Sequence, residues 1–194
     1  KYQNIFIDLD DTIWNFRTNS KIALEIIYDR YGLSEYYPLF DEYYRVYSEK
    51  NTELWSLYHH NRISKETLIV ERFRYPLQRV GAYNDKLVLQ LNADYLSVLS
   101  EQGELVPQAR ELLDYLKSRS YRLHIISNGF KEVQFKKMKS AGIENYFEKI
   151  ILSDEVGVNK PHPDIFRYAL NKTGSSKNTS LMIGDNYDAD ILGA

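Results

Sequence analysis

The order of apolar segments along the chain is the feature that most constrains its fold. The chain opens on a short apolar run, Ile5, Phe6, Ile7 and Leu9, which is typical of a strand buried on both faces. After about residue 105, predicted helices and strands alternate at short spacing: a helix at 108–119, a strand at 121–126, a helix at 131–141, a strand at 149–152, a helix from Pro163 and a strand at 179–183. This alternation predicts an α/β fold with a doubly wound, Rossmann-like parallel sheet that includes the first strand.

The stretch between the first strand and the alternating region has a different pattern. Apolar residues recur every three or four positions through four successive segments, and Gly32, Gly81 and Gly103 stand where three of these segments end. No strand pattern interrupts them, so we expect a four-helix bundle inserted into the sheet domain. The predicted domains are a core made of residues 1–17 and 103–194 and a helical insertion made of residues 18–102.

Composition excludes several classes of function. The absence of cysteine rules out disulfides, thiol catalysis and thiolate metal sites. The 25 basic and 27 acidic side chains nearly balance, without a long basic block, which argues against nucleic acid as a partner. No apolar run approaches the ~18 residues of a membrane span, and the first residues do not form a signal peptide. We therefore expect a cytoplasmic globular protein that binds neither membrane nor nucleic acid.

Polar residues follow each predicted strand, at the end where open α/β sheets hold their chemistry. The four segments are 8–12, 127–129, 153–161 and 184–190, and each offers a carboxylate, a hydroxyl or a lysine. Any one of them alone is typical of an ordinary turn or helix cap. All four in this order favour a single site at one edge of the sheet.

The acidic residues among them suit a divalent cation. Asp8 and Asp10 are two apart on an extended segment, so their side chains start on the same face. Asp185 arrives from another strand end as a third source of oxygen, and hard oxygen ligands suit Mg²⁺.

The remaining polar residues suit an anion such as phosphate. The Ser127 hydroxyl is able to donate a hydrogen bond to a phosphate oxygen, and Lys160 is able to neutralise the charge. Asn128 and Gly129 open a predicted helix, whose backbone N–H groups favour an anion.

These residues resemble the haloacid dehalogenase superfamily over essentially the whole chain. The four superfamily motifs appear in order as Asp8-Leu9-Asp10-Asp11-Thr12, Ser127, Lys160, and Gly184-Asp185 followed by Asp190. The resemblance implies that Asp8 is a nucleophile that forms an aspartyl-phosphate and that Asp10 is the general acid and then the base. It further implies that Ser127 and Lys160 hold the phosphate.

The resemblance also implies a metal site and a reaction type. Asp8, the backbone carbonyl of Asp10, and Asp185 are expected to bind Mg²⁺, while Asp190 supports the metal waters or Lys160. Dehalogenases of the superfamily lack the second aspartate, so Asp10 points to phosphoryl chemistry. Position 11, often glycine in the superfamily, is an aspartate here.

The inserted helices resemble the superfamily's helical C1 cap, and two further segments narrow the resemblance. Asn128-Gly129-Phe130 with Gln134, and residues 157–163, are similar to YjjG-type 5′-nucleotidases, which implies pyrimidine nucleoside monophosphates as substrates. A phosphatase of sugar phosphates or phosphoglycolate is the alternative, followed by a phosphomutase. A phospho-accepting signalling domain or a binding domain is the competing class.

Two aromatic residues are candidates for contact with the substrate. Trp14 and Phe16 lie just past the expected nucleophile, where a ring could stack on a base.

Relatives continue through at least one more strand and helix beyond the position of Ala194, so we expect the sheet to lack an edge. The sequence leaves monomer and homodimer equally open.

Overall fold

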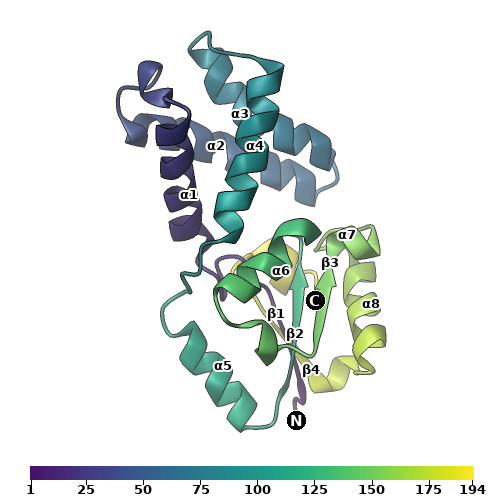
Figure 1. Cartoon of the computed structure of the whole chain (residues 1–194). Coiled ribbons are helices and arrows are strands. Elements are labelled where there is room, and N and C mark those ends of the chain that lie inside the picture. The colour runs from purple at the N-terminus through teal and green to yellow at the C-terminus, as the bar shows by residue number, and fades with distance from the viewer. The chain divides into compact units, whose positions relative to one another are not determined.

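The computed structural model describes residues 1–194, and the chain divides into two compact units. Residues 1–18 and 100–194 form the first, here called the sheet unit, and residues 19–99 form the second, the helical unit. Figure 1 shows the strands in the sheet unit and a group of long helices in the other. Each unit is described by itself.

A four-stranded parallel sheet organises the sheet unit (Figure 1). Its strands are β1 (Asn4–Ile7), β2 (Arg122–Ser127), β3 (Lys149–Leu152) and β4 (Ser180–Ile183), in the order β3-β2-β1-β4. Ile7 at the end of β1 lies level with Ile125 of β2 and Ile183 of β4. The segments that leave these strands therefore emerge side by side, and the predicted doubly wound sheet is confirmed.

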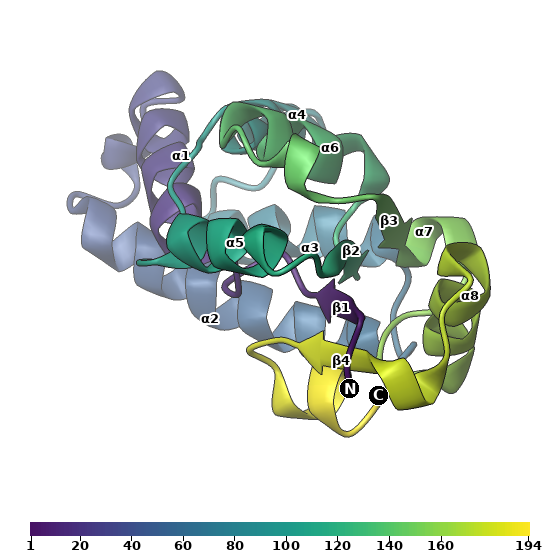
Figure 2. The ribbon, with the colours of Figure 1, turned by 90° about the horizontal axis from the view of Figure 1, so that it is seen from below.

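Helices cover both faces of this sheet, as Figure 2 shows. Helices α5 (Ala109–Ser118) and α6 (Lys131–Ser140) lie on one face, and α8 (Pro163–Thr173) lies on the other, after the short α7 (Ser153–Val156). On the α8 side, buried residues of three strands pack against Ile165 and Ala169: Phe6, Ile126 and Ile151. Single helical turns complete the chain at Leu33–Glu35, Glu144–Tyr146, Lys177–Thr179 and Tyr187–Ile191.

The helical unit contains the four helices expected from the apolar repeat. They are α1 (Phe16–Arg30, which begins in the sheet unit), α2 (Phe40–His59), α3 (Lys65–Arg79) and α4 (Asp85–Ser100). Rings from three helices form its core: Tyr43, Tyr47, Phe73 and Tyr95. The Arg72 guanidinium is buried beside two of these rings and donates to Asn92. All three of these tyrosines thus fill the unit's interior.

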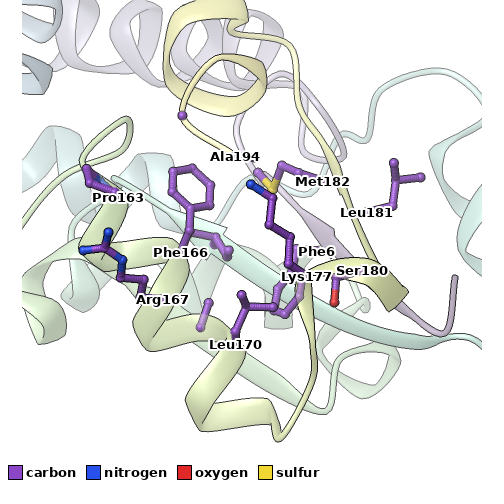
Figure 3. A pocket seen from close by; sticks show the side chains of 13 residues that line it. Phe6, Pro163, Phe166, Arg167, Leu170, Lys177, Ser180, Leu181, Met182 and Ala194 are labelled. Atoms are coloured by element: carbon purple, nitrogen blue, oxygen red, sulfur yellow. The ribbon is translucent and has the colours of Figure 1, made fainter.

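A cavity of about 270 Å³ lies beside β4 and α8, and Figure 3 shows the side chains that line it. Its lining includes Phe6, Phe166 and Met182 together with the last residues, Gly193 and Ala194. None of the motif residues lines the cavity, so the cavity is separate from the predicted catalytic site.

No helix of either unit has the length and apolar character that crossing a membrane requires.

His124 makes the stability of the sheet unit depend on pH. It is fully buried in β2, 5.1 Å from the Phe6 ring, and burial lowers its pKa from 6.5 to about 4. Between these values the unfolded chain binds a proton that the folded chain does not, so folding stability falls as the pH drops from 6.5 towards 4.

We expect His124→Leu to flatten this dependence, because the variant has no imidazole to protonate on unfolding. Urea denaturation followed by circular dichroism across that pH window measures the difference. His162→Gln, which removes an exposed histidine, is the matched control and should keep the wild-type slope. An unchanged slope in His124→Leu would show that this histidine does not control the acid sensitivity.

Candidate active site

A buried lysine bridges two carboxylates at the carboxyl end of the sheet. Asp8 directly follows β1, and its backbone N–H donates to the carbonyl of Ile183 in β4. Lys160 Nζ donates to Asp8 Oδ1 at 2.7 Å and to Asp190 Oδ1 at 2.5 Å. All three residues are buried. Segments far apart in the sequence therefore meet at one ammonium group.

The protonation of this cluster follows from its burial. The pKa of Asp8 is raised to about 7, chiefly by burial and also by the Asp190 charge, with Lys160 acting in the opposite direction. Burial alone would lower the pKa of Lys160, but Asp8 and Asp190 outweigh it and the pKa is raised. Lys160 thus stays charged, while Asp8 needs further positive charge nearby to be fully ionised at neutral pH.

Thr12 connects Asp8 to the loop that follows β4. Its hydroxyl accepts from the Asp185 N–H at 3.0 Å and lies 3.3 Å from both Asp8 Oδ2 and Asp185 Oδ1. Burial raises the pKa of Asp185 as well. Carboxylate oxygens of Asp8, Asp185 and Asp190 lie within 4.8 Å of one another. Three acids around one lysine leave an excess of negative charge.

This donor set fits Mg²⁺, since it consists of hard oxygens. Asp190 already uses both of its oxygens, one on Lys160 and the other on the Asn186 N–H at 3.1 Å. Asp8 and Asp185 are therefore the carboxylates suited to bind the ion, and Asp190 is suited to support Lys160. Gly184 allows this packing, because a Cβ atom there would collide with the Asp190 carboxyl group.

Ser127 is the last residue of β2, and its hydroxyl oxygen accepts two hydrogen bonds. Its Oγ accepts from the Gly129 N–H at 3.0 Å and from Gln134 Nε2 at 2.7 Å. Asn128 was expected to offer its backbone N–H to phosphate, and its side chain has a separate structural role. Its Nδ2 donates to the carbonyl of Lys160 at 2.9 Å and its Oδ1 accepts from the Lys160 N–H at 2.8 Å. Asn128 therefore holds the Lys160 backbone in place.

Asp10 is kept apart from the Lys160 cluster by partners of its own. Its Oδ1 lies 2.9 Å from Lys137 Nζ, and its Oδ2 accepts from Gln134 Nε2 at 2.9 Å. Sequence reasoning missed Lys137 and noted Gln134 only through a resemblance. A usable signal is their spacing of three on α6, which places both on one face of the helix.

The aromatic candidates lie beside Lys137. Trp14 is fully buried, and its Nε1 donates to the carbonyl of Gln102 at 3.2 Å. Lys137 Nζ lies 4.5 Å from the centre of the Trp14 ring and 5.4 Å from that of Phe16. Trp14 is thus buried against Lys137, and its contact with substrate stays a prediction.

The aspartate at position 11 has a structural explanation. Asp11 adopts a φ of 59°, in the left-handed region that glycine enters freely and aspartate tolerates. Its carboxylate accepts from the Arg17 N–H at 3.0 Å, which ties the loop to the start of α1. An aspartate is therefore compatible with the backbone conformation at this position.

Comparison with known proteins agrees with this geometry. Residues 2–194 match the model of the haloacid dehalogenase-like hydrolase family. The chain belongs to this family. It is similar to pyrimidine 5′-nucleotidase YjjG of Escherichia coli, with 31% identity over all of this chain and 81% of the relative. It is also similar to glyceraldehyde 3-phosphate phosphatase of Methanothermobacter thermautotrophicus, with 32% identity over 98% of this chain and 80% of the relative.

Solved structures of the family share the architecture. The HAD-hydrolase YfnB of Bacillus subtilis, in a crystal form bound to magnesium, has a TM-score of 0.91 and 27% identity, covering all of this chain and 84% of that one. An L-2-haloacid dehalogenase from Xanthobacter autotrophicus has a TM-score of 0.71 and 18% identity, covering 97% and 72%. The second likeness shows the fold alone.

We expect Lys160→Met to destabilise the hydrolase by about 3–5 kcal/mol above pH 7, because it leaves two buried carboxylates without their cation. The loss should shrink as the pH falls and Asp8 becomes protonated. Urea unfolding in metal-free buffer measures both effects. Lys136→Met, which removes an exposed lysine on α6, is the control. Equal stabilities of the two variants would show that the buried bridge is not a stability determinant.

Proposed function

We propose that this hydrolase is a Mg²⁺-dependent phosphatase that cleaves phosphate monoesters through an aspartyl-phosphate on Asp8. We further propose that its substrates are pyrimidine nucleoside 5′-monophosphates. The observation behind the proposal is that two aspartates after one strand, Asp8 and Asp10, are bound to different lysines, Lys160 and Lys137. Neighbouring carboxylates with separate partners are suited to separate roles.

In the first step, ionised Asp8 attacks phosphorus in line with the leaving oxygen. The bond between phosphorus and the ester oxygen breaks, and Asp10 gives its proton to that oxygen as the alcohol leaves. A covalent intermediate on Asp8 replaces one difficult displacement by two easier ones. Lys160, 2.7 Å from Asp8 Oδ1, is close enough to balance charge on the phosphoryl group as well.

In the second step, a water molecule attacks phosphorus while Asp10 accepts its proton. The acyl phosphate bond breaks, which releases inorganic phosphate and restores the Asp8 carboxylate. Ser127 donates a hydrogen bond to a phosphoryl oxygen during both steps. Mg²⁺, held by Asp8, Asp185 and the carbonyl of Asp10, would supply the positive charge that keeps Asp8 ionised and neutralises the phosphate.

The choice of substrate rests on resemblance. Relatives named as pyrimidine 5′-nucleotidases are 31% and 29% identical, and relatives named as glyceraldehyde 3-phosphate phosphatases are 31–33% identical. Identity does not separate the two groups, so a small sugar phosphate is the second candidate. The segments 128–134 and 157–163 favour the nucleotide. Asp10 argues against a phospho-accepting switch, because it supplies the base that hydrolyses the intermediate.

Phosphate release from a panel of esters tests the proposal. With Mg²⁺, we expect turnover of uridine and cytidine 5′-monophosphates to exceed that of glyceraldehyde 3-phosphate and phosphoglycolate, and chelation of the metal to abolish it. Asp8→Asn should show no release above background, because an amide does not replace the nucleophile. Circular dichroism of that variant checks that it is folded.

Preference for the sugar phosphates would refute the nucleotidase assignment and keep the mechanism. Turnover by Asp8→Asn near the wild-type rate would refute the mechanism itself.

A further inference from the structure

We propose that Gln134 and Lys137 are positioning residues, which together fix the Asp10 carboxylate and the Ser127 hydroxyl in the orientations that catalysis requires. Both belong to α6, one helical turn apart, and both are buried. The inference rests on the proposed function, since it assigns these residues to the groups that transfer the proton and bind the phosphate.

The Asp10 side chain is held at both oxygens. Lys137 Nζ lies 2.9 Å from Oδ1, and Gln134 Nε2 donates to Oδ2 at 2.9 Å. A carboxylate bound at each oxygen from one rigid helix has little freedom to rotate. Since the exposed fraction of the Asp10 side chain is 28%, water alone would leave it mobile.

Gln134 extends the same restraint to Ser127. Its Nε2 carries two hydrogens, one for Asp10 Oδ2 and one for Ser127 Oγ at 2.7 Å. Ser127 Oγ also accepts from the Gly129 N–H, so both of its lone pairs are used. The hydroxyl proton is then free to donate, which is the role that phosphate binding needs.

The orientation of the Gln134 amide leaves one of its polar atoms without a hydrogen bond. Its Oε1 is buried without a hydrogen-bond partner, although buried polar atoms rarely lack one. Turning the amide over would bring this oxygen against the Asp10 carboxylate. A side chain at position 129 would also collide with the Gln134 amide, so Gly129 leaves room for it. The orientation of the Gln134 amide is thus fixed by the two oxygens to which its Nε2 donates, Asp10 Oδ2 and Ser127 Oγ.

Lys137 is itself fixed in place. The exposed fraction of its side chain is only 4%, and its ammonium group lies over the rings of Trp14 and Phe16 at 4.5 and 5.4 Å. Cation–π contact and the ion pair with Asp10 hold the same group. The two aromatic residues therefore act on Asp10 through Lys137.

The two residues should differ in their kinetic effects, because only Gln134 contacts Ser127. We expect Lys137→Met to lower kcat by about tenfold to a hundredfold with little change in KM, since a displaced catalytic group loses rate on this scale. Gln134→Met, of similar volume, should lower kcat and raise KM together. Lys137→Arg should recover part of the rate, and Lys136→Met should behave as wild type.

The test measures kcat and KM of these four variants for nucleoside 5′-monophosphates, alone and combined with Asp10→Asn. A positioning role predicts that Lys137→Met causes no further loss once Asp10 is replaced. Urea unfolding without metal gives a second readout: the effects of Lys137→Met and Asp10→Asn on stability should be non-additive.

Kinetics of Lys137→Met and Gln134→Met equal to those of Lys136→Met would overturn the inference. So would a loss from Lys137→Met that is undiminished in the Asp10→Asn background, because it would indicate a general structural defect. An inactive wild-type enzyme that releases no phosphate from any ester would instead refute the proposed function.

Discussion

The buried ammonium group of Lys160 is the interaction on which the rest of the site depends. It joins Asp8, after the first strand, to Asp190, near the end of the chain, at 2.7 and 2.5 Å. Burying such a group is expensive unless its partners are close and well oriented. The chain meets this need with Asn128, whose amide bonds both the N–H and the carbonyl of Lys160, and with Gly184, which leaves space for Asp190.

A separation of charges follows from this arrangement. Asp8 and Asp10 are two residues apart, yet Asp8 pairs with Lys160 and Asp10 pairs with Lys137 on a different element. Burial raises the pKa of Asp8 to about 7, so the balance between its two forms is sensitive to any positive charge nearby. The proposed magnesium ion and Lys160 act on that balance, whereas α6 acts on Asp10. One short loop thereby presents two carboxyl groups that are held by different partners.

The sequence predicted the parallel sheet and the residues that meet at its edge for a physical reason. Parallel strands end at the same edge, so a polar segment after each buried strand implies proximity without knowledge of the packing. Ser127, Lys160 and Asp185 were found in this way.

The partners on α6 were not predictable by the same argument. Four of its ten residues are lysines, so its sequence is typical of a solvated helix and hides the burial of Lys137. The burial of Trp14 was hidden for a related reason, because its indole N–H bonds to Gln102, 88 positions away, which no local pattern reveals. Tertiary contacts of this kind decide which polar side chains are buried.

Trapping the covalent intermediate tests the central claim most directly. Asp10→Asn should still accept a phosphoryl group from p-nitrophenyl phosphate, because that leaving group departs without a proton, but it should hydrolyse the intermediate slowly. After acid quenching, mass spectrometry is expected to find one phosphoryl group on the peptide that contains Asp8, and none in Asp8→Asn. Phosphate release by the variant with no phosphorylated Asp8, or with phosphate on another residue, would contradict the assignment of Asp8 as the nucleophile.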